Sequence, residues 1–401
     1  MDVKTRYRFR FYPTAAQKTL LARTFGCVRF VYNWGLRMRS DAYRNGQKID
    51  YHQSSALLTK LKATKEFSWL NEVSCVPTQQ ALRHLQTGMI NFFEKRAKYP
   101  TFKSKHGTQA AEYTCSAFKW DAVNRNLSIA KVGRLDVHWS RDFQSIPSTV
   151  TITKDCAGRY FVTLCLDETF KPLPKTGAKI GIDFGLTRLA TLSNGERIAN
   201  PRHLRAKEAK LAKAQRVLSR RKKGSGRWRR QKLTVARIHA RIADSRKDHL
   251  DKLTTNLVRR FDDVFVEDLN LRGMVKNHCL AKSLSDAGIG MAIQMLVYKA
   301  ARYGKTLAKI DRFWPSSKTC HVCGFRRKDL SLDVREWDCP ECKTHHDRDE
   351  NAAKNILAVG QTVTARGGTV RPARASARAG KSRRSVNLPV VGKSCSHGSP
   401  F

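Results

Sequence analysis

The sequence predicts an α/β protein with a small β-barrel, a helical insertion and a four-cysteine zinc ribbon. Three observations support this fold class. Short β-rich runs lie on both sides of a helical region, apolar strands alternate with long helices after residue 177, and two C-x-x-C pairs follow residue 319. With 401 residues the chain is too long for one ordinary hydrophobic core. We therefore expect two or three folded units.

The N-terminal region predicts one strand followed by helices. Residues 4–11 alternate aromatic side chains with arginines, the period-2 pattern of a strand with one buried and one basic face. Pro13 ends this strand, and Thr14 with Gln17 predicts a capping box at the start of a helix. The apolar residues at helical spacing are Leu21, Phe25 and Val28 in this helix and Leu82, Leu85, Met89 and Phe92 in a later helix that begins near Pro77.

Residues 110–170 change to a β-rich texture. The segment 148–167 predicts a hairpin that turns at Ala157-Gly158. We expect the first strand to join these runs in a barrel or sandwich, with the helices inserted between them. Residues 171–177, KPLPKTG, are expected to form a linker.

The region after the linker predicts an α/β sheet and a strongly basic helix. Two strands joined by a Gly turn are expected within residues 178–198, and another within 262–271. A helix that places Ile289, Ile293, Leu296 and Ala300 on one face is expected next, followed by the segment 305–316. Residues 205–248 predict a long helical stretch with 17 Lys+Arg against 3 Asp+Glu, a balance of 17 − 3 = +14. Its thin apolar stripe consists of Leu211, Leu218, Leu233, Ile238 and Ile242. Residues 361–401 carry eight Lys+Arg and no acids, which predicts a disordered basic tail.

The charge of the whole chain indicates a polyanionic partner. It holds 77 Lys+Arg against 33 Asp+Glu, a formal net charge of +44. Lys and Arg docked on phosphates release counterions, so nucleic acid is the expected partner. The alternative is a solubilising surface, but such surfaces mix both signs of charge.

The sequence gives no sign of a membrane partner. No run approaches the length of a membrane span and the first residues lack a signal-peptide core, so we expect a soluble, cytoplasmic protein that is nucleoid-associated when bound to DNA.

Three acidic residues are candidate ligands of a catalytic metal. Asp183 and Glu267 lie in apolar strands, where an unpaired carboxylate is costly, and Asp349 lies at the start of the last predicted helix. Carboxylates suit Mg²⁺ or Mn²⁺, and two such ions catalyse phosphodiester hydrolysis. Taken singly, Asp183 could instead open a turn, Glu267 could pair with an arginine, and Asp349 could cap a helix. In this order they match the RNase H-like pattern, and Asp268 and Asp347 are expected to play supporting roles beside them.

The most specific local signal is a pair of C-x-x-C knuckles with 15 residues between them. The four cysteines are Cys320, Cys323, Cys339 and Cys342. Four thiolates at this spacing predict a closed, structural Zn²⁺ site, whereas a redox motif would occur once. The nearby His321, His345 and His346 are expected to face the surface or nucleic acid, and the isolated cysteines to act as small hydrophobic residues.

These ordered motifs resemble the transposon-encoded TnpB (OrfB) proteins, compact relatives of the type V CRISPR effector nucleases. The match runs through FYPTAAQ, RFVYNW, GIDFGL, LSRRKKGS, VFVEDLNLRGM, LSDAG, FWPSSKTCHVCG, WDCPEC and HDRDENAAKNI. The resemblance implies a wedge β-barrel (residues 1–13 and 109–172), a helical recognition lobe (14–108), a RuvC-like nuclease domain (173–315 and 346–360), a zinc-ribbon segment (316–345) and a basic tail (361–401). It also implies that Asp183, Glu267 and Asp349 form the RuvC triad.

By this resemblance the chain is expected to be an RNA-guided DNA endonuclease. A guide RNA derived from the transposon end would direct it to target double-stranded DNA beside a short motif. The expected nucleic-acid contacts are Arg216, Arg220, Arg221, Lys222, Lys223, Arg237, Arg241, Tyr51 and Gln79. Two alternatives stay open, a non-catalytic DNA-binding transposase accessory protein and a guide-free nuclease acting on branched DNA.

Overall fold

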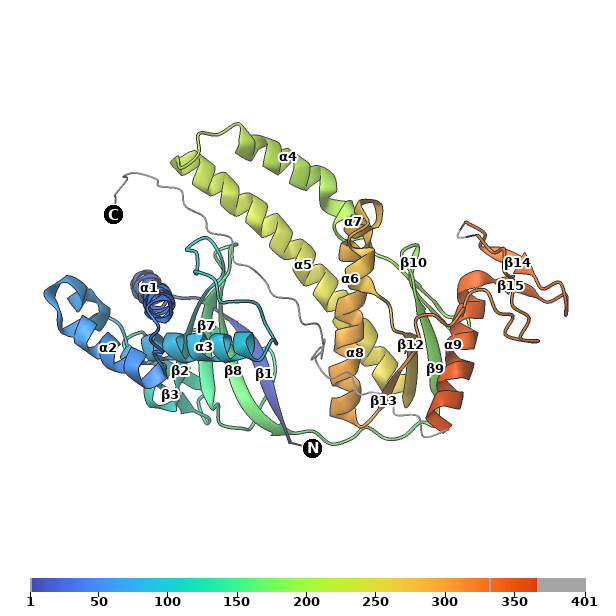
Figure 1. The fold of residues 1–401 in the computed structure, drawn as a ribbon, viewed down its shortest axis with the longest axis horizontal. Helices are drawn as coiled ribbons and strands as arrows, with labels where there is room; N and C mark the ends of the chain where they lie inside the picture. The colour runs from blue at the N-terminus through green and yellow to red at the C-terminus, as the bar shows by residue number, and fades with distance from the viewer. Residues whose placement is uncertain (1, 332, 366–401) are drawn as a thin grey trace.

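A computed structural model describes residues 2–331 and 333–365 of the chain (Figure 1). The N-terminal half comprises β1 (Asp2–Phe11), α1 (Ala15–Arg44), α2 (Tyr51–Ala63), α3 (Cys75–Phe93), β2 (Gln109–Thr114), β3 (Phe118–Asp121), β4 (Asn126–Ile129), β5 (Gly133–Arg134), β6 (Val137–His138), β7 (Thr149–Lys154) and β8 (Tyr160–Thr169). The C-terminal half comprises β9 (Lys179–Phe184), β10 (Arg188–Leu192), β11 (Arg197–Ala199), α4 (Glu208–Ser219), α5 (Gly226–Arg260), β12 (Asp263–Glu267), α6 (Leu271–Met274), α7 (His278–Ala287), α8 (Ile289–Tyr303), β13 (Thr306–Ile310), β14 (Glu336–Asp338), β15 (His345–Asp347) and α9 (Arg348–Ala365). No helix among these residues has the length and apolar character needed to cross a bilayer.

The N-terminal half is an antiparallel sheet covered by inserted helices. Its strand order is β2-β7-β8-β1-β6, and a separate three-stranded sheet has the order β3-β4-β5. The first strand therefore pairs with β8, far along the chain, and α1 to α3 are inserted between β1 and β2. This sheet has two edges, β2 and β6, so the closed barrel stays a prediction.

The local signals at the N-terminus are confirmed. Tyr7, Phe9 and Phe11 are buried on one face of β1. The side chain of Thr14 accepts a hydrogen bond from the backbone N–H of Gln17, and the Gln17 side-chain oxygen accepts one from the backbone N–H of Thr14, as a capping box requires. The predicted hairpin is β7–β8, whose turn has Gly158 at φ +75°. The apolar residues predicted for α1 and α3 pack into the same core, except Phe92, which is half-buried and packs against Phe93 and Tyr99.

The C-terminal half is a mixed sheet with helices on both faces. Its order is β11-β10-β9-β12-β13, with β12 parallel to β9 and to β13 and β10 antiparallel to β9. Residues of α5 and α8 pack with Ile182 and Val266 on one face. On the other face, α9 packs against Phe265 and Ile310 through Ile356. Figure 1 shows α9 and α8 on opposite sides of β9 and β12.

The basic helical stretch is a hairpin of two helices. It breaks between Ser219 and Gly226, and α5 then continues to Arg260, beyond the predicted end at residue 248. Of the predicted apolar stripe, Leu211, Ile238 and Ile242 are buried between α4 and α5, whereas Leu218 and Leu233 are half-buried outside this cluster. The thin apolar stripe thus holds the two helices together, which leaves their basic faces to solvent.

The last helix also extends past its predicted end. The sequence placed its end at residue 360, but α9 continues to Ala365. A Cβ added to Gly360 would come within 2.1 Å of the Phe265 ring, so the sheet supports the helix at this point. The remainder of the predicted tail, residues 366–401, lies outside the described residues.

The segment that joins the two halves is fixed at several points. Residues 171–177 contain no helix or strand, as predicted. The backbone N–H groups of Thr176 and Gly177 donate to the Asp262 carboxylate, at 2.9 and 2.7 Å, and the Lys305 ammonium donates to the Pro174 carbonyl. The linker is therefore bound along the C-terminal half.

Gly181 permits the closest approach of α9 to the sheet. A Cβ at this position would meet the Ala353 carbonyl oxygen at 2.2 Å and the Leu357 nitrogen at 2.6 Å. We expect Gly181→Ala to force α9 away from β9 and to lower the free energy of unfolding by about 1–3 kcal/mol, since overpacking strains a close-packed interior. Thermal unfolding measures this, with Gly226→Ala as the control, because a Cβ at Gly226 meets no atom within 4 Å. An unchanged melting temperature for Gly181→Ala would contradict the expectation.

Candidate active site and zinc ribbon

Three different elements bring the candidate carboxylates together at the carboxyl ends of β9 and β12, two inner strands of the C-terminal sheet. Asp183 lies near the end of β9, opposite Thr191 of β10. Val266 pairs with Ile182 across the parallel strands, so Glu267 ends β12 beside Asp183. Asp349 lies in the first turn of α9, which packs on β9. The fold thus unites acids that are 166 residues apart at the extremes, 349 − 183.

The three carboxylates interact electrostatically. Burial, together with the negative charges of Glu267 and Asp349, raises the pKa of Asp183 to about 8, against a partial offset from Arg348 and Arg335. Burial likewise raises the pKa of Glu267, although the Ser316 hydroxyl donates a hydrogen bond to its Oε1 and opposes this shift. Clustered acids of this kind are costly by themselves and favour a bound cation. Oxygen donors on a partly buried site fit a hard divalent metal ion.

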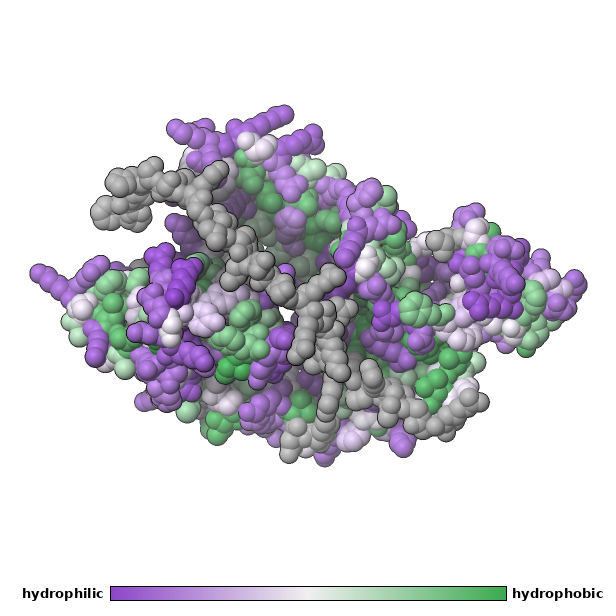
Figure 2. Space-filling view, viewed as in Figure 1, coloured by the Kyte–Doolittle hydropathy of each residue, from purple (hydrophilic) through white to green (hydrophobic). Residues whose placement is uncertain are grey.

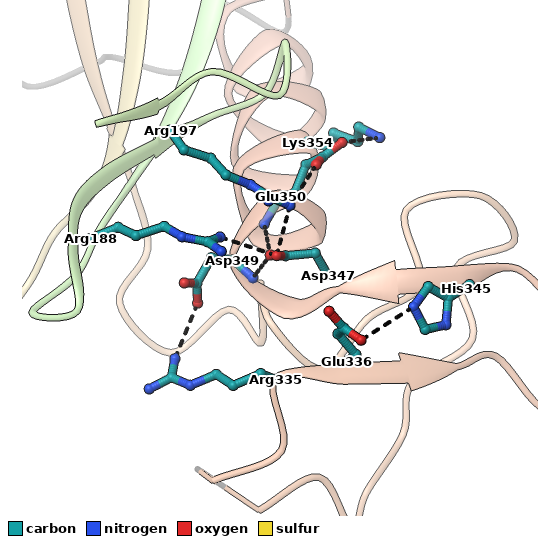
Figure 3. A network of polar contacts seen from close by, with 9 residues as sticks. All are labelled: Arg188, Arg197, Arg335, Glu336, His345, Asp347, Asp349, Glu350 and Lys354. Carbon is teal, nitrogen blue, oxygen red and sulfur yellow. Dashed lines mark hydrogen bonds and ion pairs between the residues drawn. The ribbon is translucent and has the colours of Figure 1, made fainter. Parts of the chain in front are cut away.

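Arg335 is a residue of this site that the sequence does not reveal. It lies just before β14 in the ribbon segment, and its Nη1 donates to Asp349 Oδ1 at 3.4 Å (Figure 3). Its side chain is 59% exposed, so the guanidinium can also face a bound anion. In a chain with 77 Lys+Arg, no pattern distinguishes this arginine from the others. Only the docking of the ribbon on α9 places it here.

Asp347 fixes the start of α9 instead of joining the three carboxylates. Its Oδ1 accepts the backbone N–H groups of Asp349 and Glu350, at 3.0 and 3.1 Å, which caps the helix. Its Oδ2 accepts from Arg188 of β10 and Arg197 beside it on β11 (Figure 3). Burial opposes ionisation of Asp347, but the Glu350 N–H and the two arginines lower its pKa. The helix that carries Asp349 is thereby tied to the sheet that carries Asp183.

Asp268 is engaged elsewhere. Lys309 donates to its Oδ1 and Arg312 to its Oδ2. This carboxylate is therefore neutralised by basic residues of the β13 region.

The four ribbon cysteines form a compact metal-binding cluster. Their sulfur atoms all lie within 4.8 Å of one another, and across residues 2–331 and 333–365 no other set of three or more His, Cys, Asp or Glu is gathered this closely. Cys320 and Cys342 are 3.6 Å apart at sulfur, and Cys323 and Cys339 are 3.5 Å apart. Tetrahedral zinc with Zn–S bonds of about 2.3 Å requires sulfurs about 3.8 Å apart. The spacing fits four thiolates around one structural metal ion.

The expectation for the ribbon histidines is wrong at His346. This residue is buried, and its Nε2 lies 3.1 Å from Cys320 Sγ. Its ring packs on the Trp337 ring, with 4.6 Å between the two ring centroids. Alternation along β15 turns His346 inward, while His345 is exposed beside Glu336 and Asp338. His321 is half-buried and binds Asn351.

The expectation for the isolated cysteines holds only at Cys27, which is buried. Cys165 is half-buried, Cys75, Cys115, Cys156 and Cys279 are exposed, and Cys395 lies outside the described residues. A cysteine outside a periodic apolar pattern carries no burial signal.

Buried asparagines of α9 connect the ribbon to the candidate active site. Asn351 Nδ2 donates to the Thr319 carbonyl at 2.7 Å, and Asn355 Nδ2 donates to the Ser316 and Thr319 carbonyls at 2.8 and 2.6 Å. The chain of contacts then continues through the Ser316 hydroxyl to Glu267. The first zinc knuckle and the carboxylate site are therefore parts of one hydrogen-bonded unit.

Most of the predicted nucleic-acid contacts lie on the α4–α5 hairpin. Arg216, Arg220, Lys222, Lys223, Arg237 and Arg241 are exposed there, and Arg221 is half-buried. Figure 2 shows hydrophilic side chains over the α4–α5 hairpin, at the top of the view, and over the ribbon. Tyr51 and Gln79 lie apart from them on α2 and α3, and the Tyr51 hydroxyl accepts a hydrogen bond from Arg83.

Comparison with known proteins places this architecture in a family. The OrfB_IS605 model, described as "Probable transposase", matches residues 157–278, and a Cas12f1-like TNB domain matches residues 290–356. A protein of Streptomyces pristinaespiralis named "Putative RNA-guided DNA endonuclease" is 51% identical over 95% of each chain. The InsQ protein of Escherichia coli, with the same descriptive name, is 30% identical over 92% of this chain and 95% of its own. The chain belongs to the OrfB (TnpB) family.

The fold of this OrfB protein also matches a solved structure. It covers 89% of this chain and 99% of the matched chain in a Cas12f1-sgRNA-target DNA complex, with a TM-score of 0.53 and 12% identity. A helix-turn-helix model matches residues 1–48. In this OrfB protein those residues, described from Asp2 onward, form one strand and one continuous helix of 30 residues.

Proposed function

We propose that this OrfB protein is an RNA-guided DNA endonuclease that cleaves double-stranded DNA beside a short motif. The observation that carries the proposal is the convergence of Asp183, Glu267 and Asp349 at the carboxyl ends of β9 and β12, with a pKa of about 8 for Asp183. Such a cluster suits catalysis better than stability. The relatives named as RNA-guided DNA endonucleases and a net charge of +44 support the same function.

The catalytic domain we propose is RuvC-type and RNase H-like, formed by residues 173–315 and 346–360. Asp183, Glu267 and Asp349 would hold Mg²⁺ or Mn²⁺, which, when bound, activates the attacking water and stabilises the leaving oxygen. Ser316 orients Glu267, and Asp347 fixes the backbone of Asp349. Arg335 lies where it can pair with the scissile phosphate, because its guanidinium is exposed beside Asp349.

The remaining parts would hold the nucleic acids. We assign the guide RNA to the basic faces of α4 and α5, and the DNA motif to the helical lobe and β-sheet of the N-terminal half, with Tyr51 and Gln79 as candidate contacts. Zn²⁺ in the four-cysteine ribbon has a structural role. A guide RNA, a heteroduplex and a displaced strand together require more positive charge than a single duplex.

Sequencing the RNA that copurifies with the protein tests guided cleavage. We expect one discrete RNA species that ends in a guide segment, and cleavage of DNA that matches this segment. If only heterogeneous cellular RNA copurified, the guide-free nuclease would be favoured instead.

A second candidate is a non-catalytic DNA-binding accessory of transposition. The helix-turn-helix match over residues 1–48 favours it. The single continuous helix found there weakens this candidate, because such a motif needs two helices joined by a turn.

Arg335 offers a specific test of the proposed centre. We expect Arg335→Ala to lower the cleavage rate about 10²-fold, similar to the loss of one preorganised donor at a reacting oxyanion. Zinc content and thermal stability should not change, since the side chain is 59% exposed. Cleavage time courses measure the effect, with Arg326→Ala as the control, another exposed arginine of the ribbon. Equal rates for the two variants would remove Arg335 from the centre.

A further inference from the structure

An exposed aromatic residue lies in the segment that joins β13 to Ser316, a residue bound to the carboxylate site. Phe313 is 84% exposed, whereas the other exposed phenylalanines of the described residues, Phe93 and Phe102, are 64% and 58% exposed. Phe313 follows β13, and β13 pairs with β12 so that Ile310 lies opposite Glu267. Phe313 stands three positions before Ser316, whose hydroxyl binds Glu267, so the Cα atoms of Phe313 and Ser316 are at most about 11 Å apart.

Two hydrogen bonds to Asp311 hold the turn that carries Phe313. The Phe313 N–H donates to Asp311 Oδ1 at 2.7 Å, and the Trp314 N–H donates to the Asp311 carbonyl at 3.2 Å. Trp314 packs into the core with Phe265 and Ile310. The backbone of this turn is therefore held in place, while the ring of Phe313 remains exposed.

The charges of the adjacent side chains define what can approach this phenylalanine. Arg312 and Lys309, two basic residues close to Phe313 in the chain, both pair with Asp268. Their positive charges are therefore already paired. Arg335 lies beside Asp349. The surroundings of the carboxylates therefore offer both an exposed apolar ring and an exposed guanidinium. A nucleotide has this chemistry, with a flat base and an anionic phosphate.

We propose that Phe313 stacks on a base of the single DNA strand that enters the carboxylate site. This inference rests on the proposed nuclease function and adds a positioning residue to it. Stacking is sequence-tolerant because every base has a π-face, so it suits a nuclease whose specificity comes from a guide. The stacked base would fix the register of the strand, so that one phosphate faces the carboxylates.

The test uses the full chain with its copurified RNA and a single-stranded oligonucleotide that contains 2-aminopurine, a base whose fluorescence falls on stacking. Without added Mg²⁺ or Mn²⁺ the strand stays uncut. We expect Phe313→Ala and Phe313→Leu to weaken binding of the strand about 5- to 150-fold and to remove the quenching, because one base–aromatic stack is lost. Phe313→Tyr should restore both.

Two comparisons separate stacking from a general apolar or structural role. Tyr298→Ala, at an exposed aromatic residue of α8, should bind the strand as the parent does, and every variant should retain its RNA and its melting temperature. Full binding and quenching by Phe313→Leu, or by Phe313→Ala, would overturn the proposal. Strand binding and quenching are measured without cleavage. A parent protein that failed to cut DNA would therefore count against the proposed function, and the stacking result would be judged independently of it.

Discussion

Asp183→Ala is expected to abolish DNA cleavage, with a fall of at least about 10³-fold in rate. Asp183 is the innermost carboxylate of the site, and a metal ion that stabilises charge in the transition state contributes several kcal/mol. Asp183→Asn should be equally inactive, because an amide keeps the shape but lacks the charge. Neither variant should lose guide RNA, since the basic faces of α4 and α5 are unchanged. Cleavage assays and RNA recovery measure the two effects separately.

The control for this experiment is the neighbouring acid Asp268. Asp268→Asn removes a carboxylate that pairs with Lys309 and Arg312, so its rate should stay within a few-fold of the parent. The melting temperature of Asp183→Asn without metal should be no lower than that of the parent, because the amide replaces a carboxyl group whose ionisation is disfavoured by burial and by two neighbouring carboxylates. Undiminished cleavage by Asp183→Ala would show that these carboxylates are not the catalytic centre.

Replacing Cys339 and Cys342 with serine is expected to release the ribbon metal and to lower cleavage at least about 10²-fold. Structural zinc sites supply folding free energy, so the ribbon should unfold without the metal. The ribbon positions Arg335, and its first knuckle is bound to Asn351 and Asn355 of α9. Loss of the ribbon therefore disturbs Asp349 although no carboxylate is changed.

Zinc content, thermal unfolding and cleavage measured together check this second prediction. Cys279→Ser, at an exposed cysteine outside the ribbon, should change none of the three. If the double variant lost its metal but kept full activity, the ribbon would be an independent appendage.

Local patterns predicted most of the elements of this fold. The capping box of α1, the β7–β8 hairpin and the apolar face of α8 follow from short-range chemistry, and each is present. Element ends were less predictable, because tertiary contacts decide them. The end of α9 depends on Phe265, a residue about a hundred positions earlier in the chain that packs against Gly360.

The candidate site was only partly predictable, for the same reason. Asp183 and Glu267 are visible because a charge in an apolar strand violates a local pattern. Arg335 and Ser316 violate none, and they join the site only through the docking of the ribbon. His346 illustrates the reverse case, since a polar residue was expected outside but a three-residue strand turns it toward the cysteines. The nucleic-acid contacts stay a prediction.

The position of α9 has a consequence for how the protein is made. This helix is the last described element to leave the ribosome, and it carries Asp349 as well as the side chains that cover Phe265 and Ile310. Until it emerges, the nascent chain has the basic helices α4 and α5 but lacks Asp349, one of the proposed metal ligands, and an apolar sheet face is open. A product that stops before α9 is therefore expected to keep its basic surface and to lack the complete carboxylate site.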